Sequence, residues 1–160
     1  MIKLIPAKID DKHTFFIALT LCGFVLLSAL YALPSKALKH AQYTLSYQGK
    51  ITTLNLLVAD NFRKRYHGLS NHHDLPNAHG MILTYDHPKT AKITTEKMQF
   101  NLDIAFIDES GKIFQVATNQ APSTLKIHIE SVKSASATLE IPTSKNLAHL
   151  LQIGTTISRL

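Results

Sequence analysis

The sequence predicts a mainly β fold, a β-sandwich or barrel resembling a jelly roll with two short helices, preceded by an N-terminal transmembrane helix. Short segments of alternating apolar and polar residues, separated by turn-forming residues, recur from Tyr43 onward, as in β-sandwiches and barrels. The hydrophobic content of 45% is ample for one core in a chain of 160 residues. The run from Thr14 to Leu33 carries no charge.

The uncharged run divides the chain into four expected parts. These are a cytoplasmic segment at 1–13, a transmembrane signal anchor or signal peptide at 14–33, a linker at 34–42 and a β-rich domain at 43–160. A helix of about 20 apolar residues crosses the roughly 30 Å of hydrocarbon in a bilayer. The run exceeds the apolar stretch of about 7 to 15 residues in secretory signals, which favours a retained anchor. We expect a single-pass inner-membrane protein with a periplasmic or extracellular domain, or a secreted protein if it is cleaved near Ala37.

The strands are predicted from the alternation of residue types. Segments 43–47 and 51–57 are expected to pair through a turn at Gln48-Gly49-Lys50. Segment 70–79 reads as a polar loop. Further strands are expected at 81–85, 91–95, 102–108, 112–118, 125–130, 137–141 and 156–159.

Two short helices are expected between the strands. Asp60 is the predicted N-cap of a helix at 61–67, in which Phe62 and Tyr66 share a face and after which Gly68 suits the end. Thr143 opens a second predicted helix, which runs to Leu151 with a stripe of leucines.

The hairpin at 102–118 places a carboxylate inside an apolar strand. Asp103 shares a face with Ala105 and Ile107, so it is expected to be half-buried, where a carboxylate needs partners. In one interpretation Asp103 is a pocket carboxylate paired with Lys97 or Arg65, and these three are the predicted binding residues. In the other, backbone N–H groups or a salt bridge satisfy Asp103, and its role is structural. Asp108 and the residues up to Gly111 are expected to form the turn.

Four segments of the sequence together form a specific pattern. They are Leu102-Asp103-Ile104-Ala105-Phe106-Ile107-Asp108 before a glycine turn, Val58-Ala59-Asp60 before a helix with Arg65 and Gly68-Leu69, Leu75-Pro76 before Gly80-Met81-Ile82, and Leu139-Glu140-Ile141-Pro142. In their order along the chain and at close to the family's spacing, the segments resemble the bacterial family called domain of unknown function 192 (DUF 192), whose members are small, often exported β-rich domains. The resemblance covers roughly residues 54–157 and implies the family's fold, with no agreed activity.

The sequence departs from the family just before the aspartate strand. The family usually has an aromatic residue, methionine, lysine and asparagine there, whereas this chain has Thr94, Thr95, Glu96 and Lys97. The ring and the amide of the most plausible family pocket are therefore replaced.

The charge of the chain argues against nucleic-acid binding. Of the net charge of +6, residues 43–160 contribute 12 Lys and Arg minus 9 Asp and Glu, or +3. No basic strand interleaved with aromatic residues accompanies this mild excess. The only cysteine, Cys22, lies in the apolar run, which excludes thiol chemistry and an intrachain disulfide.

Histidines are concentrated in the loop region 67–87. His72, His73, Asp74 and His79 are candidate metal ligands, because imidazole and carboxylate groups bind zinc. The i, i+4 spacing of a strong zinc-enzyme signature is missing, so a solvated polar loop is the other interpretation.

Two functions remain open from the sequence. The leading hypothesis is a non-enzymatic binding or accessory module that needs no cofactor, acts as a monomer and is tethered to the membrane through residues 14–33. The alternative is a metal-binding protein or metal-dependent hydrolase that uses the loop 67–87. No Gly-x-Ser-x-Gly elbow supports hydrolysis by a serine nucleophile.

Overall fold

The structure, a computed structural model, describes residues 38–125 and 128–160. The predicted membrane segment at 14–33 lies outside the described residues, as do the segment before it and the start of the predicted linker. Within the described ranges, no helix is long and apolar enough to cross a membrane.

Strands dominate the described residues, which confirms the mainly β class. The strands are β1 (Lys39–Tyr47), β2 (Lys50–Ala59), β3 (Gly80–Lys89), β4 (Lys92–Thr94), β5 (Leu102–Ile107), β6 (Ile113–Gln120), β7 (His128–Glu130), β8 (Ala135–Pro142) and β9 (Thr156–Arg159). The helical elements are α2 (Phe62–His67) and two 3-10 turns, η1 (Thr143–Lys145) and η2 (Ala148–Leu150). The first strand begins at Lys39, so part of the predicted linker at 34–42 belongs to the sheet.

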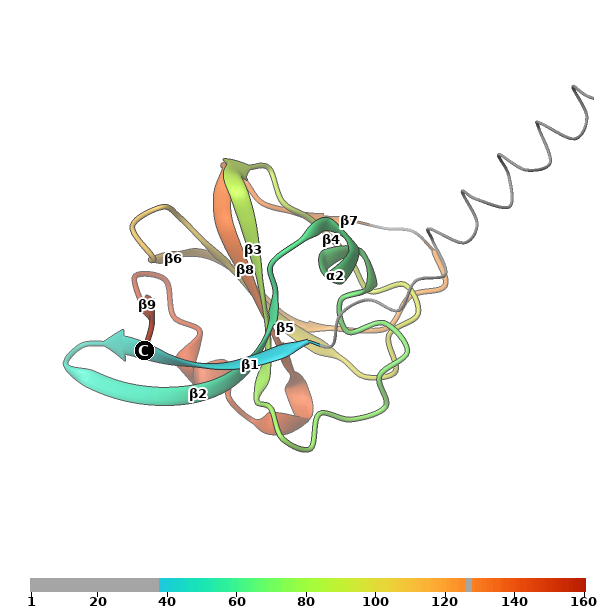
Figure 1. Ribbon diagram of the computed structural model, residues 1–160, viewed down its shortest axis with the longest axis horizontal. Helices are drawn as coiled ribbons and strands as arrows, with labels where there is room; N and C mark the ends of the chain where they lie inside the picture. The colour runs from blue at the N-terminus through green and yellow to red at the C-terminus, as the bar shows by residue number, and fades with distance from the viewer. Residues whose placement is uncertain (1–37, 126–127) are drawn as a thin grey trace, which may run out of the picture. The chain divides into compact units, whose positions relative to one another are not determined.

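The strands form one large mixed sheet and one small sheet (Figure 1). The large sheet has seven strands in the order β6-β5-β8-β3-β2-β1-β9, and β4 pairs with β7. Strands β2 and β3 are parallel, from Leu56 opposite Gly80 to Ala59 opposite Leu83. A parallel pair needs a crossover, which α2 and the loop at 70–79 supply. Seven of the nine strands thus belong to one mixed sheet rather than to the two facing sheets of a sandwich.

The large sheet curves until its two outer strands meet at one end. Lys112, just before β6, forms an isolated bridge with Thr156 of β9. Ile157 N donates to Gly111 O at 2.7 Å, and Ile113 N donates to Thr155 O at 2.9 Å. Gly111 has a φ of 77°, and a Cβ there would lie 2.8 Å from Ile157 O, so glycine is required at this junction.

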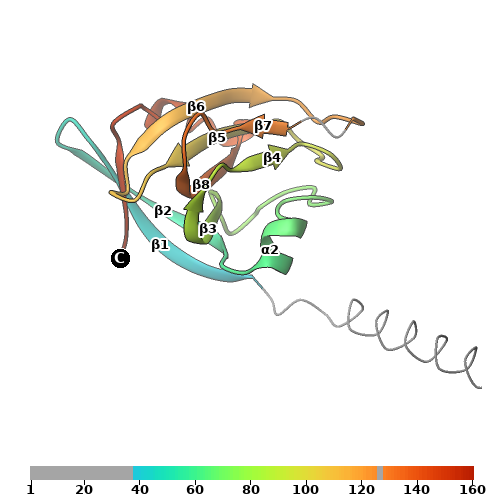
Figure 2. The ribbon, with the colours of Figure 1, turned by 90° about the horizontal axis from the view of Figure 1, so that it is seen from above.

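The two faces of the large sheet build two separate apolar cores. Alternate residues of each central strand enter different cores, as the period of two in a strand requires. The first core includes Leu45, Leu54, Leu56, Ile82, Ile107, Leu139, Ile141 and Ile157. The second core includes Leu69, Met81, Leu83, Ile93, Met98, Ile104 and Phe106. Helix α2 and the β4–β7 pair lie at the same end of the molecule in both views (Figures 1 and 2).

Helix α2 begins one residue later than its predicted cap suggests. Asn61, in an extended conformation, is the N-cap, and its Oδ1 accepts a 3.0 Å hydrogen bond from Lys64 N. The predicted cap, Asp60, is wrong because its carboxylate instead binds Lys64 Nζ at 2.8 Å. Lys64 is only 5% exposed, so its ammonium group requires this partner. Gly68 ends the helix as predicted, and its N–H donates to Lys64 O.

The second predicted helix, at 143–151, is wrong. The chain forms η1 and η2 there instead, with Asn146 between them in the left-handed conformation at φ 55°. A residue in this conformation ends a helical turn. The leucine stripe still reaches the first core, where Leu151 is buried and Leu147 and Leu150 pack against it.

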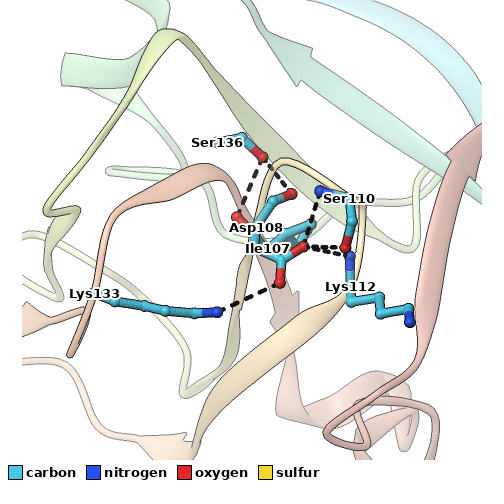
Figure 3. Close-up of polar contacts among 6 residues, drawn as sticks. All are labelled: Ile107, Asp108, Ser110, Lys112, Lys133 and Ser136. Carbon is cyan, nitrogen blue, oxygen red and sulfur yellow. Dashed lines mark hydrogen bonds and ion pairs between the residues drawn. The ribbon is translucent and has the colours of Figure 1, made fainter.

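The turn between β5 and β6 is organised by Asp108, as predicted (Figure 3). Its Oδ1 accepts hydrogen bonds from Ser110 Oγ at 2.6 Å, Ser110 N at 3.0 Å and Lys112 N at 3.1 Å. Its Oδ2 lies 3.5 Å from Lys133 Nζ. The Ser110 hydroxyl is the main reason that the pKa of Asp108 is below its usual value. These bonds fix the hairpin whose tip meets β9.

Candidate functional site

A cavity of about 630 Å³ lies on the second-core side of the large sheet. Helix α2, the end of β3, β4 with the residues after it, and β7 all contribute to its walls. Leu83, Ile93 and Met98 form apolar parts of the lining. A concave site of this size with a few polar groups is typical of small-molecule binding sites.

Glu140 supplies the one buried acid among the described residues that line this cavity. It lies on β8, opposite Met81 of β3 and Ile104 of β5, and is only 2% exposed. Its Oε2 is buried and has no hydrogen-bond partner among the described residues. Burial beside these apolar side chains raises the pKa of the Glu140 carboxyl from 4.5 to about 7. The site therefore holds a buried carboxyl group whose Oε2 is unpartnered among the described residues and whose pKa is about 7.

Gly80 allows β3 to approach β8 closely at this carboxylate. A Cβ built at Gly80 would collide with the carbonyl oxygen of Glu140. The absence of a side chain therefore fixes the position of Glu140 relative to β3.

Tyr85, on β3, lines the same cavity as Glu140. Its hydroxyl forms a 2.9 Å hydrogen bond with Oγ1 of Thr138, which is fully buried on β8. Burial raises the pKa of the Tyr85 phenol, and the nearby charge of Glu140 raises it further. The Tyr85 ring also lies 4.7 Å from Lys89 Nζ and 5.8 Å from the Arg65 guanidinium carbon. Cations within about 6 Å of an aromatic face are attracted to it.

Several positively charged side chains line the same cavity as Glu140. Arg65 donates from Nη1 to Thr84 O at 2.7 Å, and its Nη2 lies 3.6 Å from Asp86. Lys92 is paired with Glu130 at 2.8 Å. Lys89 and Lys97 also line the cavity, and neither has an acidic partner within 4.0 Å in the described parts of the chain.

Two exposed aromatic residues of α2 complete the lining. Phe62 is 72% exposed and Tyr66 is 73% exposed, and their ring centroids lie 6.1 Å apart. Their spacing of four residues places them on one face of the helix, as the sequence predicts. Large apolar groups at the edge of a cavity provide surface for a ligand to bury.

The predicted binding residues are divided between the two faces of the sheet. Arg65 and Lys97 both line the cavity, whereas Asp103 does not. Asp103 alternates with Ile104 and shares a face with Ala105 of the first core. Its Oδ1 accepts a 2.8 Å hydrogen bond from Asn119 N, at a point where β6 shifts register against β5. Asp103 thus supports the structure of the hairpin, although its Oδ2 is buried without a partner among the described residues.

The predicted metal ligands do not converge. Among the described residues, no group of three or more His, Cys, Asp or Glu side chains is arranged to hold a metal ion. His79 Nδ1 accepts from Asn55 N at 2.9 Å, and Asp74 accepts from Leu75 N at 2.6 Å. His72 and His73 make no metal-holding group with them. In the described structure, the loop 67–87 thus does not bring its candidate ligands together into such a group.

Sequence reasoning missed Glu140 and Tyr85. The signal for Glu140 was present, because the glutamate interrupts the apolar run Leu139-Glu140-Ile141 as Asp103 interrupts its own strand. Tyr85 gave no comparable signal, since a tyrosine at the end of a strand is common.

Known proteins share the fold of this domain. The model of a family described as DUF192, Uncharacterized ACR, matches residues 43–159. No curated protein matches the chain significantly in sequence. One similar structure is a Sinorhizobium meliloti 1021 protein described as a candidate transcription regulator; its TM-score is 0.71 at 18% identity, over 79% of this chain and 98% of that one. Another, a protein of unknown function from Novosphingobium aromaticivorans DSM 12444, has a TM-score of 0.70 at 21% identity, over 78% and 89% of the two chains. At these identities the likeness establishes the fold alone.

Proposed function

The chain belongs to the DUF192 family, and we propose that its domain is a non-enzymatic module that binds a small polar ligand in the cavity beside Glu140. Membership in the family agrees with the resemblance seen in the sequence. The proposal rests on the chemistry of the cavity itself.

One observation carries the proposal: Oε2 of Glu140 is buried at the cavity and has no hydrogen-bond partner in the described parts of the chain. A buried polar group without a partner costs about 1–3 kcal/mol, and more if it is charged. A core position opposite Met81 and Ile104 would be filled at lower cost by an apolar side chain. A ligand that donates a hydrogen bond to Glu140 would offset this cost and would explain why an acid occupies this core position.

Binding is favoured over catalysis by what surrounds the acid. A carboxyl group that titrates near 7 suits general acid–base chemistry. Ser70, a candidate nucleophile in the lining, donates to the backbone carbonyl of Glu96 at 3.4 Å rather than to a base. No metal-holding group of side chains is present in the described residues to activate water. Among the described residues, the site offers polar recognition but no second group in a catalytic arrangement with Glu140.

The proposal includes the location expected from the sequence. The uncharged run at 14–33 would hold the domain at the inner membrane, on the periplasmic or extracellular side. Extraction of membranes with alkaline carbonate, followed by N-terminal sequencing, tests this part. Retention of the intact chain in the pellet supports the anchor, and a soluble chain that begins near Ala37 contradicts it.

Ligand binding is tested on the full chain in detergent micelles by methyl NMR. The methyl groups of Met98 and Ile93 line the cavity, and the methyl group of Ile113 in the first core is the control. Four probes represent different classes of polar ligand: glucose, glucosamine, glycerol 3-phosphate and the dipeptide Ala-Ala. Saturable shifts at Met98 and Ile93, without a shift at Ile113, are expected for at least one probe. The proposal fails if none of the four produces a saturable shift at concentrations up to 10 mM.

A further inference from the structure

We propose that the cavity selects a zwitterionic ligand of about dipeptide size, with an amine bound to Glu140 and a carboxylate held by Lys89 and Lys97. This inference rests on the proposed function and names the ligand class of the same cavity. It follows from the arrangement of charges: Glu140 is the buried acid of the lining, and Lys89 and Lys97 have no acidic partner within 4.0 Å among the described residues, although the less buried Glu96 also lines the cavity.

The buried end of the site is built for a donor. Ionised Glu140 offers acceptors only, and its Oε2 is unpartnered among the described residues. The Tyr85 hydroxyl, which lines the same cavity, is hydrogen-bonded to Thr138 and not to Glu140. An ammonium group would give Glu140 a charge-assisted hydrogen bond, the strongest kind available at such a site.

The outer part of the site is built for an anion. Lys89 and Lys97 line the cavity and, in the described ranges, have no acid within ion-pairing distance. Lys97 has a positive φ of 63°, a conformation that is uncommon for lysine, at the end of the segment where the chain departs from its family. A ligand with a positive charge alone would meet repulsion from these lysines, and one with a negative charge alone would meet repulsion from ionised Glu140. Only a ligand with both charges, separated along its length, matches both ends.

The size and walls of the cavity agree with a ligand of dipeptide size. A volume of about 630 Å³ lies within the usual 300–1,000 Å³ range of ligand sites. Leu83, Ile93 and Met98 provide apolar surface for short aliphatic side chains. Phe62 and Tyr66 extend this surface toward solvent.

Several titratable groups line the cavity with Glu140, and they set the expected pH dependence. From α2 these are Arg65, Tyr66 and His67; from β3, Tyr85 and Lys89; from β4 and the segment after it, Lys92, Glu96 and Lys97; and from β7, His128. Among these groups, Glu140 has a pKa near 7, and its protonation removes the acceptor for the amine. The binding of an amine is therefore expected to weaken as the pH falls.

The test compares three probes that differ only in end groups. Ala-Ala carries both charges, N-acetyl-Ala-Ala only the negative charge, and Ala-Ala amide only the positive charge. Calorimetry on the full chain in detergent micelles at pH 7.5 is expected to show Ala-Ala binding at least tenfold more tightly than either analogue. The Ala-Ala affinity is expected to fall more than tenfold at pH 5.5.

Three variants assign the effects to residues. Glu140→Gln preserves the shape of the buried group and is expected to weaken Ala-Ala at least tenfold and abolish the pH dependence. Lys97→Gln is expected to weaken Ala-Ala and N-acetyl-Ala-Ala, with less effect on the amide. Lys112→Gln is the matched control, since Lys112 is also exposed and unpaired in the described structure but lies outside the cavity. A thermal unfolding transition in each variant verifies that it folds.

Several outcomes overturn the inference. If N-acetyl-Ala-Ala binds as tightly as Ala-Ala at pH 7.5, and binds more tightly at pH 5.5 than at pH 7.5, the ligand is anionic. If Ala-Ala amide binds more tightly than the other two probes, the ligand is cationic. Failure of all three probes also overturns the zwitterion inference, whereas the proposed function falls only if glucose, glucosamine and glycerol 3-phosphate fail as well.

Discussion

Asp103 and Glu140 lie on the neighbouring strands β5 and β8, one register position apart, and their side chains belong to opposite faces of the sheet. Ile104 is opposite Glu140, and Asp103 is opposite Ile141. Because side chains alternate along a strand, Asp103 lies on the face of the first core and Glu140 on the face of the cavity. Two acids that interrupt apolar strands in the same way therefore have different surroundings.

The stability of the domain is expected to fall as the pH rises from 5 to 8, because of Glu140. The pKa of this carboxyl is 4.5 in the unfolded chain and about 7 in the folded domain, so the folded state binds more protons between these values. The contribution is present below pH 4.5 and is lost as the pH rises through 7. The difference between the two pKa values corresponds to about 3 kcal/mol.

Urea titrations followed by circular dichroism measure this effect, since the chain contains no tryptophan. Glu140→Gln is the control and is expected to be more stable than the wild type at pH 8 by up to about 3 kcal/mol. Asp60 and Asp108 do not interfere, because hydrogen bonds from Lys64 and Ser110 hold their pKa values below 3.8. Equal pH dependence of the two proteins between pH 5 and 8 would contradict the burial of an unpaired acid.

Gly80→Ala is expected to destabilise the domain by about 1–3 kcal/mol, as overpacking in a core does. The new Cβ would collide with the Glu140 carbonyl oxygen and push β3 away from β8. Gly49→Ala is the comparison, because no atom lies within 4 Å of the position that its Cβ would take, and only the φ of 76° opposes it, at about 1 kcal/mol. Unfolding free energies that rank Gly49→Ala as the more damaging change would rule out the close approach at Gly80.

Asp103→Leu is expected to cost about 1–3 kcal/mol, because Asn119 N would lose its hydrogen bond to the buried Asp103 carboxyl group. Asp103→Asn retains an acceptor oxygen and is expected to stay within about 1 kcal/mol of the wild type. Neither change is expected to alter Ala-Ala binding at pH 7.5. Loss of binding in Asp103→Asn with unchanged stability would return Asp103 to the role of a ligand-binding carboxylate.

Tyr85→Phe is expected to destabilise the domain by about 1–2 kcal/mol, since it leaves the buried Thr138 hydroxyl without its partner. A double-mutant cycle with Thr138→Val isolates the pair and is expected to give a coupling energy of about 0.5–1.5 kcal/mol. Additive effects of the two substitutions would show that the hydrogen bond contributes nothing to the position of Tyr85 beside Glu140.

Local patterns predicted most of the strands, but not how they assemble. The alternation in β5 and the turn chemistry of Asp108 and Gly111 are local, and both appear where the sequence places them. The parallel pairing of β2 with β3 depends on contacts between distant segments. The false helix at 143–151 arose because the leucine spacing suits a helix, while the left-handed Asn146 divides the segment into two turns.

The site was only partly predictable, because its position also depends on contacts between distant segments. Arg65 and Lys97 were selected as cations near a possible pocket, and both line the cavity. Their predicted partner, Asp103, was selected because it interrupts an apolar strand. Which face of the sheet carries a cavity is decided by α2 and the β4–β7 pair, which are placed by tertiary contacts that periodicity does not reveal.

The most direct test of the account is the titration of the Glu140 carboxyl carbon by NMR. The glutamates of the chain are Glu96, Glu109, Glu130 and Glu140, so selective carbon-13 labelling gives few resonances, and Glu140→Gln assigns the relevant one. The account predicts a midpoint near pH 7 in the free protein and a lower midpoint with saturating Ala-Ala, because a bound amine stabilises the carboxylate. A midpoint near 4.5, or a midpoint that saturating Ala-Ala leaves unchanged, would contradict it.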